Sequence, residues 1–313
     1  MTMKRFINKN SILAVSYVAI FVLILVGTFA DLEVSKSLAV LNKGEYYTHS
    51  LFAAFFEVVG EMPVYILPST AAFIIMQYLL QGELSKAKRY TIIFIAFLVV
   101  FALNIFASFK LVLNAHNYVN LGWVYSGIFQ YFIYILVSAI FTLFCYIISM
   151  WLTNKGNLKN LAICSLIVIF TAILSQIVTQ SIKPFALRAR YRYMNYLGNF
   201  SLYSPWYDFN ANNIVGELAK KDYFKSFPSG HTTAAAMMLT LILFTTSFGE
   251  FKKRYIRSII ISVAVLFPVV VGFSRIQAGA HYLTDVSFGL LITLTAMLIS
   301  KWAVNKWLAK FFE

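Results

Sequence analysis

SRIQAGAHYLTD, residues 274–285, and PSGH, residues 228–231, stand at the two ends of a pair of apolar runs. The runs cover residues 231–248 and 258–274 and are joined by the basic turn 249–257. A helix needs roughly 20 apolar residues to cross a hydrocarbon core of about 30 Å. We therefore expect the chain to cross a membrane and return, which brings His231 and His281 to the same membrane face.

The composition extends this pattern to the whole chain. Of 313 residues, 60% are hydrophobic and 12% are charged, whereas about 25% of residues are charged in an average globular domain. These values predict an all-α fold, a polytopic transmembrane helix bundle of about eight spans. The expected spans are residues 11–30, 62–80, 91–113, 128–152, 160–182, 231–248, 258–274 and 285–303.

The net charge of +14 reflects topology, because the basic residues lie in alternate short loops and form no continuous face for a nucleic acid. Cytoplasmic loops of membrane proteins are enriched in Lys and Arg. By this rule both termini are cytoplasmic, and the loop 183–230 and the turn 275–284 face the periplasm or the exterior. We expect a membrane and a phosphorylated lipid as partners, and no nucleic acid.

Two parts of the chain are distinguished. Residues 1–160 are expected to form amino-terminal spans and loops, and residues 161–313 a catalytic membrane core whose loop 183–230 is a partly helical flap on the membrane. Within the first part, Glu57 and Glu61 lie one helical turn apart. Either their carboxylates face water from an interfacial helix, or they enter the bundle and touch a substrate or a proton.

Basic residues collect on the expected outer face. Lys183 and Arg190 follow the fifth apolar run, and Arg275 follows the seventh. Ser229 is expected to cap the sixth helix, and Gly230 to let a ligand approach the backbone. Amides at a helix start and Lys or Arg side chains are favourable partners for phosphate oxygens. These residues together predict an anion site.

Two histidines and an aspartate accompany this site. Asp285 follows His281 by four residues, so the two side chains face each other one turn apart on a helix. Such a carboxylate can hold one imidazole nitrogen protonated and leave the other free as a nucleophile. His231 remains to donate a proton to a departing oxygen. Each residue alone also fits a capping or snorkelling role, but their coincidence on one face indicates a site.

The arrangement resembles the type-2 phosphatidic acid phosphatase superfamily, which also includes glucose-6-phosphatase and the vanadium haloperoxidases. The family's second and third motifs match in every fixed position, at residues 228–231 and 274–285. Its first motif, a lysine, six residues and then Arg-Pro, is matched by Lys183 and Arg190, but Tyr191 replaces the proline. This departure puts the local shape of the loop in question.

The resemblance implies phosphoryl transfer without a metal or a cofactor. His281 would attack phosphorus to form a phosphohistidine, Asp285 would orient it, and His231 would protonate the leaving group and later activate water. The residues implied to bind the phosphate oxygens are Lys183, Arg190, Ser229, Gly230 and Arg275.

We therefore predict an integral membrane phosphatase that hydrolyses a lipid phosphomonoester or pyrophosphate. The candidate substrates are phosphatidylglycerol phosphate, phosphatidic acid, undecaprenyl pyrophosphate and lipid A phosphate, which indicate a bacterial inner membrane. One alternative is a phosphotransferase that passes the phosphoryl group to a lipid or sugar. Another is a non-catalytic transporter of phosphorylated ligands, although a transporter would carry ionisable residues deep in several spans. The natural lipid and the oligomeric state stay open.

Overall fold

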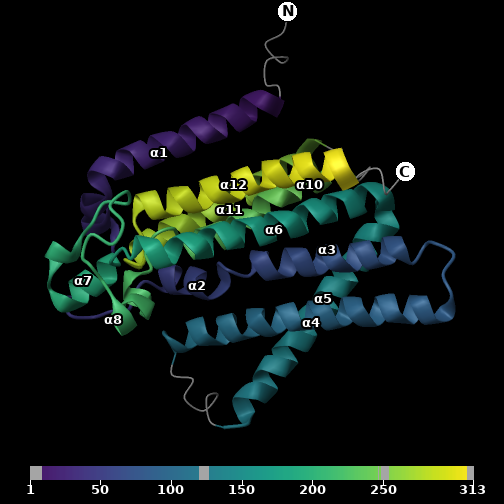
Figure 1. The fold of residues 1–313 in the computed structure, drawn as a ribbon, viewed down its shortest axis with the longest axis horizontal. Helices are drawn as coiled ribbons and strands as arrows, with labels where there is room; N and C mark the ends of the chain where they lie inside the picture. Colours follow the sequence, from purple (N-terminus) through teal and green to yellow (C-terminus); the bar gives the residue numbers. More distant parts are fainter. Residues whose placement is uncertain (1–8, 120–126, 246, 248–253, 309–313) are drawn as a thin grey trace, which may run out of the picture.

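The computed structural model describes residues 9–119, 127–245, 247 and 254–308 (Figure 1). The long helices are α1 (Lys9–Leu38), α3 (Pro63–Leu79), α4 (Lys86–His116), α5 (Phe129–Lys155), α6 (Leu158–Ala186), α11 (Arg254–Gln277) and α12 (Leu283–Ala303). The shorter helices are α2 (Leu51–Val59), α7 (Tyr191–Leu197), α8 (Gly216–Lys220), α9 (Gly230–Ala235) and α10 (Leu241–Phe244). The described residues contain no strand, which confirms the all-α fold.

This is an integral membrane protein. Among the described residues, seven helices are long and apolar enough to cross a membrane, close to the predicted eight. The second of them, Leu51–Leu79, combines α2 with α3. The predicted sixth span is a shorter apolar helix, Gly230–Phe244, in which a 3-10 segment, Ala236–Thr240, joins α9 to α10. It falls short of the roughly 20 residues that a full crossing takes.

Some residues behind the topology prediction lie outside the described part of the chain. They are the basic residues before Lys9, residues 249–253 of the predicted basic turn, and Lys310. The structure therefore describes the hairpin of α9–α10 and α11 without the centre of its connection.

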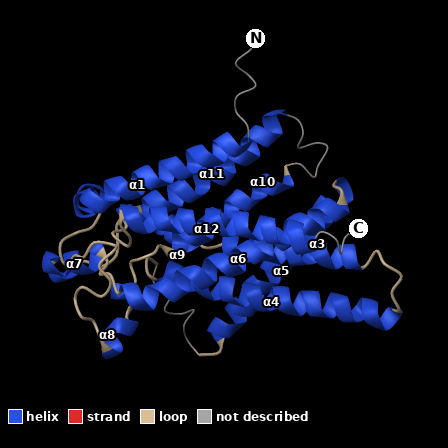
Figure 2. Cartoon of the chain, turned by 45° about the horizontal axis from the view of Figure 1, so that its top comes forward, coloured by secondary structure: helices blue, strands red, loops and turns tan. Residues whose placement is uncertain are grey.

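The helices pack in two groups. In the first, α12 lies between α1 and α6 and also contacts α9 and α11, so it stands at the centre of the carboxyl-terminal bundle (Figures 1 and 2). In the second, α3 contacts α6 on one side and α4 and α5 on the other. A methyl group at Gly289 of α12 would lie 2.9 Å from the carbonyl oxygen of Ser229. Gly289 therefore permits the close approach of α12 to the start of α9.

The connection between α6 and α9 gathers with α7 and α8 at one end of the molecule (Figure 2). This segment is partly helical, as expected, and its position on a membrane stays a prediction. Its three arginines, Arg188, Arg190 and Arg192, are all buried. Buried charges require charged or polar partners, and these partners define the polar end of the bundle.

The direction of Glu57 decides between the two alternatives for the acidic helix. Glu57 lies on α2 and is only 4% exposed, with its carboxylate turned into the bundle. The alternative in which α2 lies at the interface with the Glu57 carboxylate in water is therefore wrong. Asn114 and Tyr118, in and just after α4, bond to Glu57 through its carbonyl and its carboxylate.

Candidate active site

His281 lies in the turn between α11 and α12 and is 1% exposed. Its Nδ1 is 2.6 Å from the carbonyl oxygen of Ser226. A carbonyl oxygen only accepts hydrogen bonds, so Nδ1 must carry the proton. In the neutral ring, Nε2 then holds the free lone pair. This is the tautomer that a nucleophilic histidine requires.

The protonation state of His281 is set first by burial, which lowers the pKa of its imidazole to about 3. The Asp285 carboxylate opposes this shift, whereas the cations of Arg190 and Lys183 add to it. The imidazole is therefore neutral at physiological pH.

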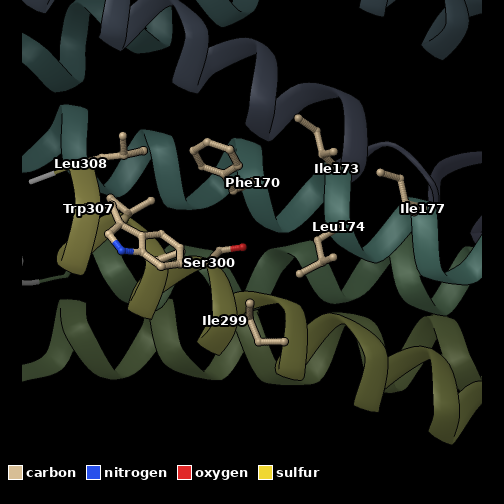
Figure 3. A pocket seen from close by; sticks show the side chains of 10 residues that line it. Phe170, Ile173, Leu174, Ile177, Ile299, Ser300, Trp307 and Leu308 are labelled. Atoms are coloured by element: carbon tan, nitrogen blue, oxygen red, sulfur yellow. The ribbon is translucent and has the colours of Figure 1, made fainter.

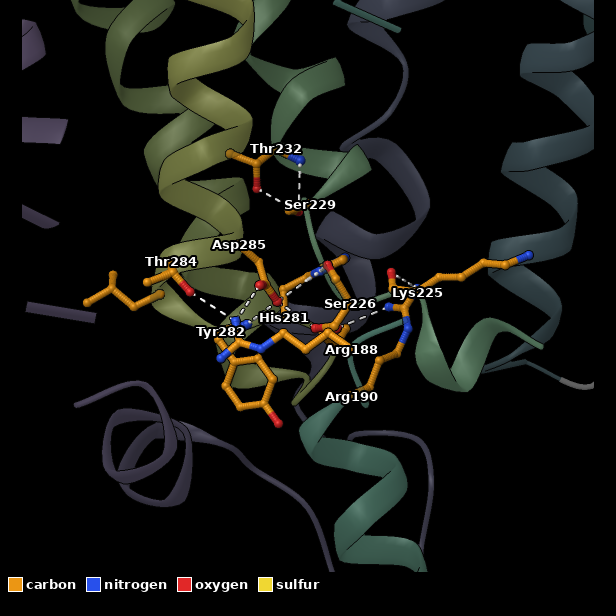
Figure 4. A network of polar contacts seen from close by, with 12 residues as sticks. Arg188, Arg190, Lys225, Ser226, Ser229, Thr232, His281, Tyr282, Thr284 and Asp285 are labelled. Carbon is orange, nitrogen blue, oxygen red and sulfur yellow. Dashed lines mark hydrogen bonds and ion pairs between the residues drawn. The ribbon is translucent and has the colours of Figure 1, made fainter. Parts of the chain in front are cut away.

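Asp285 stands in the first turn of α12, where it accepts a hydrogen bond from the amide of Tyr282 at 2.9 Å. The same oxygen accepts the hydroxyl of Ser226 at 2.5 Å and lies 3.7 Å from Nδ1 of His281. A separation of 3.7 Å is too long for a hydrogen bond. Ser226 thus joins the pair that the spacing alone predicted to bond directly, with its carbonyl on His281 and its hydroxyl on Asp285 (Figure 4).

Arg188 occupies the other side of Asp285 and is fully enclosed. Its Nη1 donates to Asp285 at 2.7 Å, and its Nη2 donates to Asp31 of α1 at 2.9 Å. The guanidinium stacks over the ring of Tyr282, 4.0 Å from the ring centroid. Asp31 in turn accepts the amide and the hydroxyl of Thr284. One buried cation therefore links two buried carboxylates from opposite ends of the chain.

Lys183 and Arg190 meet at one carbonyl oxygen. The Nζ of Lys183 is 3.2 Å from the oxygen of Lys225, and Nη2 of Arg190 is 3.5 Å from the same atom. Arg190 also donates to the carboxylate of Asp222 at 2.8 Å and to the carbonyl of Ala280 at 3.1 Å, beside His281. The two cations of the first motif thus lie together near the candidate nucleophile.

The second motif forms the start of α9. The hydroxyl of Ser229 accepts the amide of Thr232 at 3.3 Å, as predicted for a capping residue, and its own amide donates to the carbonyl of Asp285 at 3.0 Å. A methyl group at Gly230 would lie 3.9 Å from Nζ of Lys183. The ammonium group of Lys183 therefore lies over the start of the helix, so both features attract an anion.

His231 has partners at both ring nitrogens. Its Nε2 is 3.1 Å from the carbonyl oxygen of Glu57, and its Nδ1 is 3.2 Å from a carboxylate oxygen of Glu61. Glu57 belongs to α2, and Glu61 lies between α2 and α3. The second histidine is therefore held by the amino-terminal half of the chain.

Arg275, predicted to bind phosphate, is turned toward α2. Its Nη1 donates to Glu57 at 2.6 Å and its Nη2 to the carbonyl of Ala53 at 2.6 Å. The carboxylate of Glu57 also lies 3.5 Å from Arg192, which in turn lies 3.5 Å from Asp222. A phosphate-binding role of Arg275 stays a prediction, because in this structure Glu57 already neutralises its charge.

The sequence prediction missed Asp31, Arg188 and Ser226, which contact the predicted residues directly. A partial signal existed for Asp31, because an acid at the end of an apolar run is expected to need a partner. For Arg188 and Ser226 there was none, since their partners lie 97 and 59 positions away in the chain. In the described residues, no group of three or more His, Cys, Asp or Glu side chains is arranged to hold a metal ion.

Comparisons with known proteins agree with the motifs. Residues 164–309 match the family model described as the PAP2 superfamily. A curated relative, lipid A 1-diphosphate synthase of Escherichia coli (strain K12), is 29% identical over 157 residues. The match covers 49% of this chain and 54% of that protein, so it spans about half of each. No solved structure matches the chain significantly.

Proposed function

Residues 164–309 form a domain of the PAP2 superfamily, as the three motifs predicted, and from this we propose that the chain is a membrane lipid phosphatase. The proposed reaction hydrolyses a phosphomonoester or pyrophosphate headgroup through a phosphohistidine at His281. One observation carries the proposal. The hydrogen bond of 2.6 Å from Nδ1 of His281 to Ser226 leaves Nε2 free as a nucleophile, and the charges of Lys183 and Arg190 reach the same ring.

In the first half-reaction, Nε2 of His281 attacks phosphorus and the bond to the leaving oxygen breaks. His231 gives a proton to that oxygen. The phosphorylated imidazole gains positive charge, which the carbonyl of Ser226 and the carboxylate of Asp285 stabilise through Nδ1–H. Asp285 stays ionised because Arg188 neutralises it at 2.7 Å.

In the second half-reaction, water attacks the phosphohistidine and gives a proton to His231. The bond between phosphorus and Nε2 then breaks, which restores the neutral imidazole and releases phosphate. Catalysis of such transfers consists mainly of positioning and charge stabilisation. Lys183, Arg190 and the amides at the start of α9 are the groups proposed to bind the phosphoryl oxygens, with Ser229 holding that start in place.

An apolar surface beside the site supports a lipid substrate. A groove of about 410 Å³ between α6 and α12 is lined by Phe227, the residue before the second motif, and by Trp206. A second groove, of about 350 Å³, continues along the same helices and shares Leu174 and Ile299 with the first (Figure 3). A headgroup at His281 is therefore compatible with a hydrocarbon tail along α6 and α12.

The distribution of basic residues among the loops supports one orientation of the protein in the membrane. We propose cytoplasmic termini and a site that faces the periplasm or the exterior of a bacterial inner membrane. The proposed substrate class comprises phosphatidylglycerol phosphate, phosphatidic acid, undecaprenyl pyrophosphate and lipid A phosphate.

A second candidate function uses the same site. The name of the relative, lipid A 1-diphosphate synthase, describes the making of a diphosphate, which favours a phosphotransferase. In that case the phosphoryl group on His281 would pass to a lipid phosphate in place of water. The two functions differ only in the acceptor of the second half-reaction.

Isotope labelling separates the two candidates. Purified protein in detergent is given each ³²P-labelled lipid in H₂¹⁸O with EDTA, first alone and then with lipid A as acceptor. A hydrolase releases phosphate that contains one ¹⁸O atom in both cases, whereas a transferase forms a labelled lipid diphosphate without ¹⁸O only when the acceptor is present. Loss of all turnover in EDTA would contradict the metal-free mechanism.

A further inference from the structure

We infer that Glu61 and His231 share one extra proton, and that Glu61 is the positioning residue that makes His231 an acid. This inference rests on the proposed function, because it assigns the source of the proton that His231 gives to the leaving group. Glu61 lies outside the residues that match the family, which begin at residue 164. It is therefore a contribution of the amino-terminal half to the reaction.

The argument starts from the acceptors around the ring. The carbonyl of Glu57, 3.1 Å from Nε2, needs a proton on that nitrogen. A neutral imidazole has only one N–H, so Nδ1 would then present a bare lone pair to a carboxylate oxygen of Glu61 at 3.2 Å. Two lone pairs at hydrogen-bond distance repel each other. An additional proton between Nδ1 and Glu61 removes this conflict.

The proton can reside on either partner. With the proton on His231, the pair is an imidazolium and a carboxylate; with the proton on Glu61, it is an imidazole and a carboxylic acid. The other oxygen of Glu61 is buried and has no hydrogen-bond partner among the described residues. A carboxylate oxygen without donors is costly when buried, which favours keeping a proton at this pair.

Among the described residues, His231 is the charged group within ion-pair distance of Glu61, and Lys183 acts on Glu61 from farther away. The charged groups that face His231 are Glu57 and Glu61 from the α2–α3 segment and Arg275 from α11. Arg275 is bonded to Glu57 at 2.6 Å, and Lys183 of α6 lies at the neighbouring Gly230 and donates to Lys225 at 3.2 Å. With side chains 16% and 15% exposed, His231 and Glu61 are also largely shielded from water.

The backbone between the two acids fixes this geometry. Gly60 ends α2, and a methyl group at this position would lie 3.0 Å from Val271 of α11. The absence of a side chain lets the α2–α3 segment approach α11 closely enough for Glu61 to reach His231. Pro63 then starts α3, where a proline is well accommodated.

The proton balance of the reaction follows. The departing oxygen takes the proton of one ring nitrogen, and the pair is left with a single proton on the ring and an ionised Glu61. Water that attacks the phosphohistidine returns one proton to the pair. No other donor or acceptor is required over the cycle.

Glu61→Gln tests the assignment on two substrates with different leaving groups. A lipid phosphate leaves as a basic alkoxide and needs the acid, whereas 2,4-dinitrophenyl phosphate leaves as a stable anion and does not. We expect kcat/KM to fall by about 10²–10⁴-fold for the lipid and to change little for the aryl ester. Because both substrates are measured on one preparation, activity on the aryl ester shows that the variant is folded. Glu33→Gln, which changes an exposed acid of α1, is the matched control.

An equal loss on both substrates, or no loss on either, would overturn the inference while leaving the phosphatase proposal intact. Failure of the wild type on both substrates would instead contradict the proposed function, and a spectroscopic test then decides about the proton. With ¹⁵N-labelled histidine and infrared spectra, we expect either two protonated nitrogens on His231 or a carboxylic acid band that Glu61→Gln removes. A bare Nδ1 without such a band would overturn the inference.

Discussion

The two histidines of the site are held in opposite ways. His281 uses one ring nitrogen, on the carbonyl of Ser226, and all its close partners belong to the carboxyl-terminal half. His231 uses both nitrogens, on Glu57 and Glu61 of the amino-terminal half. The candidate nucleophile is thus kept neutral within the domain that matches the family. The candidate acid depends on residues outside it.

This difference teaches that a family match can cover the candidate nucleophile of a site and omit the residues that contact its candidate acid. On the His281 side, Asp31 of α1 contacts Thr284 and Arg188, and it reaches Asp285 through Arg188. The amino-terminal half reaches His231 directly. Substitutions near His281 and substitutions near His231 should therefore differ in which property they change and in how much they change it.

The largest expected effect is the loss of activity on substitution of either histidine, and the two variants should differ in how that loss depends on the leaving group of the substrate. His281→Ala removes the nucleophile and should lower kcat for every substrate, on the scale of about 10⁶-fold seen when a nucleophile is deleted elsewhere. His231→Ala should slow the first half-reaction severely only for substrates with poor leaving groups, and should slow hydrolysis of the phosphohistidine for every substrate. Single-turnover labelling with a ³²P-labelled aryl phosphate checks both, since only His231→Ala should still form an acid-labile phosphoprotein. Labelled His281→Ala would refute the role of His281.

The next effect tests the buried cation on the His281 side. Arg188→Met would leave Asp31 and Asp285 buried without their shared cation, and breaking such a pair costs about 3–5 kcal/mol. The apparent melting temperature in detergent should fall sharply, and adding Asp31→Asn should restore part of it. Lys220→Met is the control, because Lys220 pairs with Glu217 on an exposed surface. An equal response of the two single variants would mean that Arg188 is no structural link.

A smaller effect concerns pH and the neutral state of His281. Unfolded histidine binds a proton below about pH 6.5, whereas burial lowers the pKa of His281 in the folded protein to about 3. Between these values the unfolded state binds more protons, so His281 contributes a loss of stability as the pH falls from about 6.5 toward 3. The slope is at most about 1.4 kcal/mol per pH unit.

Melting curves of the wild type and His281→Gln between pH 7 and pH 4 measure this contribution. The wild type should lose stability more steeply than the variant, because glutamine does not titrate. Parallel curves for the two proteins would show that His281 does not remain neutral in the folded state.

The smallest effect is expected at the one departure from the family motifs. Tyr191 is the first residue of α7, a position where proline is favoured, and Arg190 before it has the extended conformation that proline requires. Tyr191→Pro should therefore keep the loop and the turnover, and cost only about 1–2 kcal/mol for the lost packing of a mostly buried ring. Turnover and melting temperature of the variant check this, and a large loss of turnover at normal stability would assign the tyrosine its own role.

The apolar pattern made most of the fold predictable, since each expected span contains a helix in the described residues. The sixth, predicted for residues 231–248, corresponds to the shorter apolar helix Gly230–Phe244, and apolar content alone does not reveal the 3-10 segment within it. The three motifs predicted that Lys183 and Arg190 lie together near His281. Arg275 is turned toward Glu57, and the roles of the motif residues stay predictions.

The partners of the motif residues were less accessible to prediction. Asp31 and Arg188 are 157 positions apart, and Glu57 and Arg275 are 218 apart. Such pairs leave no periodic signal in a single sequence, and each member alone also fits an exposed or snorkelling charge. The direct bond expected between His281 and Asp285 failed for a local reason, because Ser226 enters between them from the loop before α9.

The hydrogen bond between Asp31 and Thr284 spans 253 positions of the chain. This separation matters during synthesis, because the two residues leave the ribosome at different times. Translation at about 5–20 residues per second separates the synthesis of these two residues by roughly 13–50 s. Until Arg188 is made, 157 positions after Asp31, α1 carries a carboxylate without its neutralising arginine, and the helix-start donors of Thr284 arrive last. We therefore expect α1 to rely on the insertion machinery until Arg188 arrives, and a chain stalled before residue 188 to expose Asp31 as an unpaired acid that quality-control proteases can recognise.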